Sequence, residues 1–284
     1  VAPGHLFIAL KGEAMDGHRF VSQALAAGAA GVLVGEAAEG PHVRVADTMA
    51  ALNALGAAAR ARTGAQVIGV TGSAGKTGTK EALWAALERC APGHAHRSVK
   101  SYNNHTGVPL SLARMPQDTR YGVFEMGMNH AGELAALTRL VRPHVAIVTT
   151  IASAHREFFA SEEAIADAKA EIFQGLRPGG VALVPFDNPH GSRLAAAARA
   201  CGAEVRTFGL EEGADIRAHY VVKAPGGGSM VTAELGEAQL SFTLSQPGLH
   251  WVANALAVLG AVQAVGGDLA IAGLALAELG GLKG

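Results

Sequence analysis

Five short runs of apolar residues recur through the middle of this chain, and the first four each precede a stretch with the spacing of a helix. The runs are continuous rather than alternating, which is typical of strands covered on both faces. Strands of this kind that alternate with helices form a largely parallel sheet with right-handed crossovers. The runs are Val67–Val70, Gly122–Glu125, Val145–Thr150, Val181–Pro185 and Val205–Phe208. The helices are Thr77–Cys90, Gly132–Val141, Ser161–Phe173 and Asn188–Cys201.

Different patterns flank this repeating region. From Ile216 to Leu244 apolar and polar residues alternate around Gly226–Gly228, which predicts an appended antiparallel hairpin region. Residues 1–62 indicate short strands and two helices, the second capped by Asp47. We therefore predict an α/β protein with a small N-terminal α/β domain at residues 1–64. A central domain at residues 65–284 would contain the mostly parallel sheet flanked by helices.

Charge and composition exclude several classes of protein. The formal net charge of the 284 residues is −1, so no overall field attracts nucleic acid or an anionic membrane. The most apolar stretch, Trp251–Leu279, is interrupted by polar residues and glycines, which predicts two buried helices and no membrane insertion. Two cysteines, Cys90 and Cys201, are too few for a disulfide framework and indicate reduced, buried thiols in a cytoplasmic protein. We expect a monomer.

The loop between the first apolar run and its helix has the features of a phosphate-binding loop (P-loop). Glycines let backbone N–H groups converge on phosphates, and the following helix N-terminus adds its dipole. Lys76 would bind the β- and γ-phosphates of ATP, and the Thr77 hydroxyl would bind Mg²⁺. Val70 replaces the first glycine of the strict G-x4-G-K-[ST] pattern; the alternative is a glycine turn beside a surface lysine. The loop residues are Thr71, Gly72, Ser73, Ala74, Gly75, Lys76 and Thr77.

Two candidate metal ligands follow other apolar runs. Glu125 ends its run, and ligands of open parallel sheets gather beyond the carboxyl ends of the strands. A carboxylate there is placed to hold Mg²⁺ on a nucleotide, although it could instead cap a helix or face solvent. His155 follows the next run and could also ligate a metal, although Mg²⁺ prefers oxygen and a single histidine more often has a structural role.

Lys169 has an unusual position in the predicted helix Ser161–Phe173. The i,i+4 spacing places it within the apolar stripe of that helix. A lysine among apolar neighbours must pair or lose its proton, and a neutral amine can react with CO2 to give an anionic carbamate. The alternative is an ammonium that reaches solvent at the edge of the stripe. The stripe consists of Ile165, Ala168, Ile172 and Phe173.

These motifs, in this order and spacing, resemble those of the Mur ligases, the bacterial ATP-dependent enzymes that build the peptidoglycan stem peptide. Residues 3–18 resemble the family's uridine-nucleotide domain, and residues 247–256 resemble its adenine-side motif. Three further segments resemble the MurF branch, which adds D-alanyl-D-alanine to UDP-N-acetylmuramoyl-tripeptide. They are Asn103–Pro109, Glu125–Glu133 and Ala154–Phe159.

The resemblance implies a role for each matching residue. Lys76 would bind phosphates, Thr77 and Glu125 would hold one Mg²⁺, and His155 with carbamylated Lys169 would hold a second. His250 and Asn254 would line the adenine side of ATP. The implied reaction activates a carboxylate as an acyl phosphate, which the amine of D-alanyl-D-alanine then attacks. Residues implied to lie towards the peptide substrate are Asn103, Asn104, Asn129 and His130.

Some family features are missing, and other functions remain open. Trp251 follows His250 where the family usually has His-Asn. The Ser/Thr-Arg segment expected before Val1 and the C-terminal domain are both absent, so we expect this fragment to bind nucleotide weakly and not to turn over alone. The alternatives are a MurE-type amino-acid-adding ligase, a P-loop regulatory NTPase that switches a partner, and a non-catalytic nucleotide-binding fragment.

Overall fold

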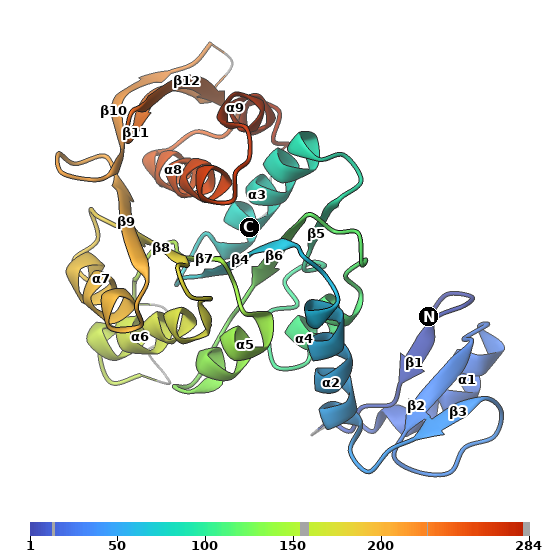
Figure 1. Cartoon of the computed structure of the whole chain (residues 1–284). Coiled ribbons are helices and arrows are strands. Elements are labelled where there is room, and N and C mark those ends of the chain that lie inside the picture. Colours follow the sequence, from blue (N-terminus) through green and yellow to red (C-terminus); the bar gives the residue numbers. More distant parts are fainter. Residues whose placement is uncertain (13–14, 154–158, 226, 281–284) are drawn as a thin grey trace.

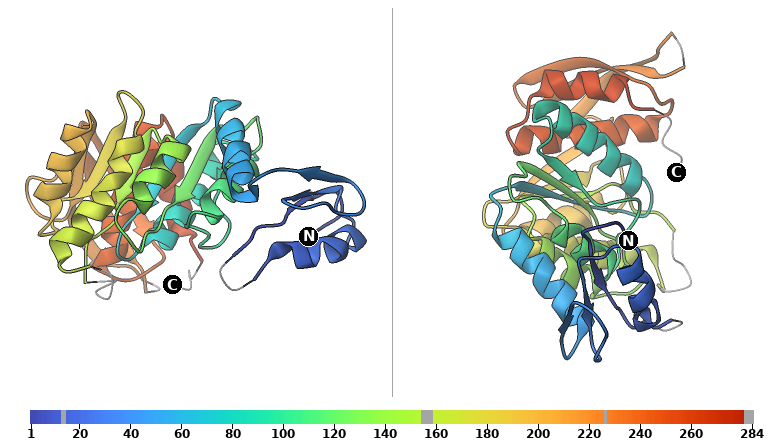
Figure 2. Two further views of the ribbon diagram at one scale, coloured as in Figure 1. Left: turned by 90° about the horizontal axis from the view of Figure 1, so that it is seen from below. Right: turned by 90° about the vertical axis from the view of Figure 1, so that its right-hand side faces the viewer.

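The computed structural model describes residues 1–12, 15–153, 159–225 and 227–280, which form two separate sheets (Figures 1 and 2). The smaller sheet is parallel, with the order β1-β2-β3. Figure 2 shows it projecting from the rest of the molecule. Its elements are β1 (Leu6–Ile8), the 3-10 helix η1 (Gly17–Phe20), α1 (Val21–Ala26), β2 (Gly31–Val34) and β3 (His42–Arg44).

The larger sheet has nine strands within the described residues, in the order β12-β11-β10-β9-β8-β7-β4-β6-β5. All the pairings from β5 through β4 to β10 are parallel. Strands β10, β11 and β12 form an antiparallel meander at one edge. The strands are β4 (Gln66–Thr71), β5 (Ala95–Arg97), β6 (Tyr121–Glu125), β7 (Val145–Val148), β8 (Val181–Pro185), β9 (Glu204–Gly209), β10 (Ile216–Lys223), β11 (Ser229–Leu235) and β12 (Ala238–Leu244).

Helices cover both faces of the larger sheet (Figure 1). On one face lie α3 (Lys76–Cys90), α8 (Leu249–Ala264) and α9 (Leu269–Ala277). On the other face lie α4 (Gly107–Ala113), α5 (Glu133–Val141), α6 (Glu162–Ala170), the 3-10 helix η2 (Glu171–Gly175) and α7 (Gly191–Ala200). Two buried apolar clusters therefore sandwich the sheet: Ile68 and Val70 of β4 belong to one, and Val67 belongs to the other.

The structure confirms the predicted fold class. The first four continuous apolar runs are parallel strands buried on both faces, because a covered strand has no solvent side to require polar residues. The fifth, Val205–Phe208, is also parallel but only partly buried. The expected burial of both cysteines is wrong, since Cys90 is half-buried and Cys201 is exposed. The alternating segment is antiparallel, as predicted. The predicted helix Ser161–Phe173 ends earlier, since its last turn continues as the 3-10 helix η2.

Helix α2 (Thr48–Ala61) connects the two sheets. The Asp47 carboxylate accepts hydrogen bonds from the backbone N–H groups of Met49 and Ala50, so this residue caps α2 as expected. The helix packs against α4 and α5 of the larger unit, although its sequence follows the smaller sheet. The boundary at residue 64 stays a prediction.

Across the described residues, no helix combines the length and the apolar character that a bilayer crossing requires.

Candidate active site

Several of the residues singled out by the sequence lie close together where β4 meets its two neighbours. The chain crosses from β6 on one side of β4 to β7 on the other, which creates a topological switch point. Glu125 is paired in register with Val70, and Val148 with Thr71, so the loops after all three strands leave the sheet at one edge. Crevices at such edges are the usual ligand sites of open α/β sheets.

The loop after β4 adopts a conformation that requires its glycines. Gly72 has φ 151° and Gly75 has φ 81°, values that side chains rarely tolerate. A Cβ on Gly72 would also overlap the Thr149 hydroxyl. That hydroxyl contacts the Ala74 carbonyl oxygen at 2.6 Å, and the Ser73 N–H donates to the Thr150 carbonyl at 2.8 Å. The segment that directly follows β7 thus fixes the loop, which leads into the N-terminus of α3.

Lys76 is the first residue of α3 and its side chain folds back over the loop. Its ammonium donates to the Gly72 carbonyl at 2.8 Å. Burial lowers the pKa of Lys76, and the nearby Glu125 carboxylate partly opposes this shift. A cation held over a glycine loop at a helix N-terminus is suited to bind phosphate groups.

Glu125 is 1% exposed and is surrounded by hydrogen-bond donors. Its Oε2 accepts from the Thr77 hydroxyl at 3.0 Å, and its Oε1 accepts from the Asn103 amide at 2.7 Å. The structure therefore places the predicted metal ligands Thr77 and Glu125 in direct contact. Asn103, predicted to lie towards the substrate, belongs to the same cluster.

These oxygens fit a magnesium ion that also contacts a nucleotide. Mg²⁺ is usually bound by one or two carboxylates together with substrate phosphates and water, rather than by an all-protein cage. In keeping with this, the part of the chain that the structure describes has no group of three or more His, Cys, Asp or Glu side chains able to hold a metal. His155, the other predicted ligand, lies outside the described residues.

Lys80 is a buried cation that the sequence analysis missed. Its side chain is fully buried, and its ammonium lies 3.1 Å from Glu81 Oε1 and 3.6 Å from Glu125 Oε2. It also donates to the Lys100 carbonyl oxygen. Lys80 thus links α3, the end of β6 and the segment that carries Asn103.

We expect Lys80→Met to lower the free energy of unfolding by about 3 kcal/mol, because the buried Glu125 carboxylate loses its ion-pair partner. Urea denaturation measures the change. The double variant Lys80→Met/Glu81→Gln is the control. Glu81 is partly exposed and pairs with Arg97 at 2.9 Å, so it does not depend on Lys80 for a counterion. The double variant should therefore lose about as much free energy of unfolding as Lys80→Met alone. Full recovery in the double variant would place the critical charge at Glu81 instead.

Lys169 is 1% exposed, within the apolar stripe that the sequence predicted. Burial lowers its pKa to about 7, and repulsion from Lys76 contributes to the shift. Within the described residues its amine has no hydrogen bond and no carboxylate partner. A substantial fraction of Lys169 is therefore neutral near pH 7, which is the state that can react with CO2.

A cavity of about 300 Å³ extends from the loop towards α8. Ala74 and Gly75 line it on one side, and His250 and Asn254 line it on the other. The Asn254 amide packs so closely that a Cβ on Gly75 would lie 2.9 Å from it. The structure thus brings both predicted adenine-side residues beside the phosphate loop.

The remaining predicted residues lie at the edge of this cluster. The Asn104 carboxamide oxygen caps α4 by accepting from the N–H of Gly107 at 2.9 Å, which gives this side chain a structural role as well. Asn129 and His130 are exposed, and both backbone N–H groups donate to the Glu133 carboxylate. Their contact with a substrate stays a prediction.

Comparison with known proteins places this arrangement in one family. Residues 70–262 match the family model described as the Mur ligase middle domain. The chain belongs to the Mur ligase family. Residues 1–93 also match a second model, described as the Mur ligase family, catalytic domain.

Individual Mur ligases cover nearly all of the chain. UDP-N-acetylmuramoyl-tripeptide–D-alanyl-D-alanine ligase of Bacillus subtilis is 37% identical over 90% of this chain and 55% of its own length. A MurF structure from Acinetobacter baumannii superposes with a TM-score of 0.89 and 34% identity, covering 100% of this chain and 62% of that one. The structure of MurF ligase from Thermotoga maritima in complex with ADP superposes with a TM-score of 0.83 and 27% sequence identity, covering 99% of this chain and 64% of that one. The chain thus spans between 55% and 64% of the length of these relatives.

The cavity beside the phosphate loop is lined by further residues that sequence reasoning did not find. Asp187 and Asn188 follow β8 and line the same cavity as His250. The Asn188 amide donates to the Ile151 carbonyl at 2.9 Å, which ties the loop after β8 to the loop after β7. Their position just past the run Val181–Pro185 was the available signal, because the same rule had identified Glu125.

Proposed function

We propose that the intact protein is an ATP-dependent ligase that adds D-alanyl-D-alanine to UDP-N-acetylmuramoyl-tripeptide in bacterial peptidoglycan synthesis. The observation that carries the proposal is the contact of Thr77 with the buried Glu125 carboxylate at 3.0 Å, directly beside the Lys76 phosphate loop. The relatives that match most of the chain are ligases of this kind.

The reaction follows from the chemistry of a carboxylate, which is a poor electrophile. The carboxylate oxygen attacks the γ-phosphorus of ATP, and the bond from that phosphorus to the bridging oxygen breaks to release ADP. The amine then attacks the acyl phosphate carbon, loses a proton and expels inorganic phosphate. Lys76 stabilises the charge on the transferring group, and the fixed loop holds it in line.

Two cofactors belong to this proposal. Thr77 and Glu125 would hold one Mg²⁺, which neutralises phosphate charge when bound. Carbamylated Lys169 and His155 would serve a second metal position. The lowered pKa of Lys169 supports the carbamate, since only the neutral amine reacts with CO2. His250 and Asn254 would contact the adenine side, while Asn103, Asn104, Asn129 and His130 would face the peptide.

The proposed site suits a monomer in the bacterial cytoplasm, where ATP is available. Analytical ultracentrifugation of the intact protein tests the oligomeric state.

The substrate test compares amines. We expect the intact protein with ATP, Mg²⁺ and UDP-N-acetylmuramoyl-tripeptide to release phosphate with D-alanyl-D-alanine at least 10²-fold faster than with any single amino acid, because a site built for a dipeptide leaves polar groups unpaired with a shorter amine. Phosphate release and mass spectrometry of the product measure this. Faster turnover with one amino acid on a UDP-linked dipeptide would assign a MurE-type ligase, and nucleotide hydrolysis without an amide product would assign a regulatory NTPase.

A further inference from the structure

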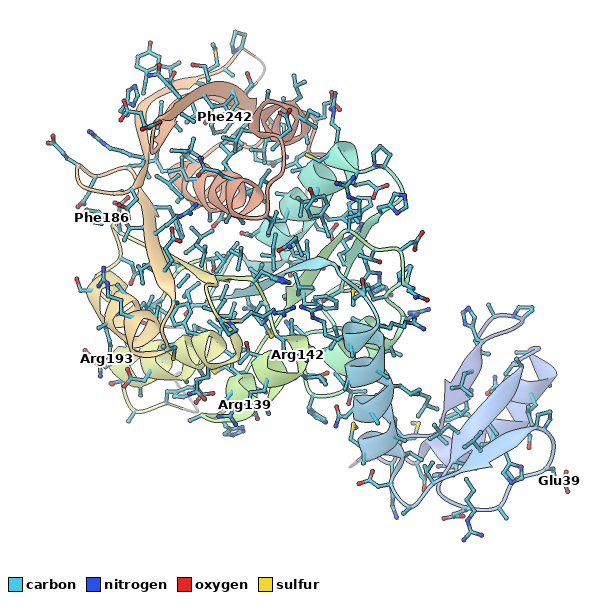
Figure 3. All side chains as sticks on the ribbon, in the orientation of Figure 1. Glu39, Arg139, Arg142, Phe186, Arg193 and Phe242 are labelled. Carbon is cyan, nitrogen blue, oxygen red and sulfur yellow. The ribbon has the colours of Figure 1, made fainter. Side chains whose placement is uncertain are left out.

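A second polar cavity lies at the amino ends of the parallel strands, whereas the phosphate loop lies at their carboxyl ends. Its volume is about 520 Å³, and its lining includes four arginines of the described chain: Arg60, Arg139, Arg142 and Arg177. Arg60 ends α2 before β4, Arg142 follows α5 before β7, and Arg177 precedes β8. The arginines therefore surround the amino ends of the parallel strands. Figure 3 labels Arg139 and Arg142 at the C-terminal part of α5.

The guanidinium groups of these four arginines lack acidic partners in the part of the chain that the structure describes. In the described residues, no Asp or Glu carboxylate lies within the 4.0 Å of an ion pair from any of the four. The arginines that do form such pairs are Arg89, Arg97, Arg193 and Arg206. Arg139 instead donates to the neutral Gln174 amide oxygen at 2.9 Å.

Arg60 is only 2% exposed and is fixed in place. Its Nε donates to the Val141 carbonyl at 2.8 Å, and its Nη2 donates to the Arg142 carbonyl at 2.9 Å. Burial, followed by repulsion from Arg142 and Arg177, lowers the pKa of Arg60 to about 10. Burial and repulsion from Arg60 and Arg177 also lower the pKa of His144 to about 4. The cavity therefore has a positive field that disfavours any further cation.

Helix ends cannot balance this charge. The carbonyls capped by Arg60 belong to the C-terminus of α5, and η2 also ends at the cavity. Each helix C-terminus is equivalent to about half a negative charge. The C-terminus of α2 at Ala61 lines the cavity as well, so three helix ends offset about one and a half of the four positive charges. Arg139, Arg142 and Arg177 are exposed to solvent, whereas Arg60 is buried.

From this charge imbalance around a cavity, we infer that the pocket formed by Arg60, Arg139, Arg142 and Arg177 binds a small polyanion that carries phosphate or several carboxylate groups. Planar guanidinium groups pair with both kinds of oxyanion in a two-pronged geometry. Arg139, Arg142 and Arg177 are exposed around the cavity and Arg60 is buried and rigidly held at its base, so a small anion can enter between them. This site is independent of the ligase chemistry, because it lies at the amino ends of the strands and the phosphate loop lies at their carboxyl ends.

The test titrates the intact protein with inorganic pyrophosphate, and separately with citrate, by calorimetry at constant ionic strength and without Mg²⁺. Pyrophosphate can also enter the phosphate loop, so the measurements use a Lys76→Ala background. We expect one remaining site that Arg142→Gln/Arg177→Gln weakens about tenfold or more, because charged hydrogen bonds are lost. Preference for pyrophosphate assigns phosphate ligands, and preference for citrate assigns polycarboxylates.

The charge-matched control is Arg193→Gln/Arg206→Gln, which removes two arginines that already have acidic partners. It should bind as tightly as its Lys76→Ala parent. In an NMR titration, anion binding should also shift the ring signals of His144, which neighbours Arg60 and Arg177. Equal binding by both double variants, or no binding of either probe in the Lys76→Ala protein, would overturn the inference. If the protein sediments with anionic phospholipid vesicles but does not bind pyrophosphate, the arginines bind a membrane surface, and the inference is overturned too.

Discussion

Lys76→Ala is expected to lower kcat/KM for ATP about 10³-fold, the upper range for removing one fixed charge donor from a phosphoryl-transfer site. The Lys76 ammonium lies 2.8 Å from the Gly72 carbonyl, on the loop whose glycines bring backbone N–H groups together. Neither the helix dipole nor Mg²⁺ replaces a point charge at this position. Coupled detection of ADP release by the intact protein, with saturating peptide and amine substrates, measures the loss.

Lys223→Ala is the matched control, since Lys223 is an exposed lysine at the end of β10 on the antiparallel part of the sheet. Its kcat/KM should stay within twofold of the parent protein. Circular dichroism and thermal melting of both variants separate a loss of catalysis from a loss of fold. A folded Lys76→Ala protein with unchanged kcat/KM would show that the nucleotide phosphates bind elsewhere.

The sequence predicted the catalytic edge because elementary topology places it there. In a parallel sheet the residues that follow the strands share one end of the sheet, so the loop after Val70 and the residue Glu125 were expected at the same end. Their contact depends on the pairing of β4 with β6. The order of strands around β4 was not predictable in the same way. It depends on which crossover packs best, and apolar runs of equal length carry no information about their neighbours.

The burial of Lys80 was indicated by helical spacing in the sequence, but this indication was not used. The spacing that singled out Lys169 also applies to α3, where Lys80 falls in one stripe with Leu83 and Leu87, and all three are fully buried. What the spacing could not give was the partner, because Glu125 is 45 residues away and reaches Lys80 only through strand pairing. A buried lysine can be anticipated from periodicity, whereas its counterion depends on tertiary structure.

The arginine cavity was beyond sequence reasoning altogether. Arg60, Arg142 and Arg177 are far apart in the chain, and each alone resembles a common basic residue near the end of a helix. They meet because α2, which follows the small sheet in sequence, packs on α4 and α5 of the large unit. Nothing in the pattern of α2 indicates which sheet it covers.

In the intact protein, Lys169→Met is expected to abolish the proposed ligase activity while raising stability at neutral pH. The pKa of Lys169 is about 7 in the folded protein, and that of an unfolded lysine is about 10.5. As the pH falls from about 10.5 to about 7, the unfolded state gains a proton that the folded state does not, so the native protein loses stability. Below about 7 both states are protonated and the full penalty remains. A shift of this size corresponds to on the order of 3–5 kcal/mol.

Methionine has a similar length and no charge, so the variant avoids this penalty. Its melting temperature should exceed that of the parent by about 5 °C or more at pH 7, and the gap should close as the pH approaches 10. Calorimetric melts between pH 6 and pH 10 in CO2-depleted buffer measure this, because a carbamate would replace the cation with an anion. If the parent and Lys169→Met melt at the same temperature at pH 7, the amine has a partner that offsets its burial. The argument for a reactive, neutral lysine would then fail, since it depends on the same unrelieved burial.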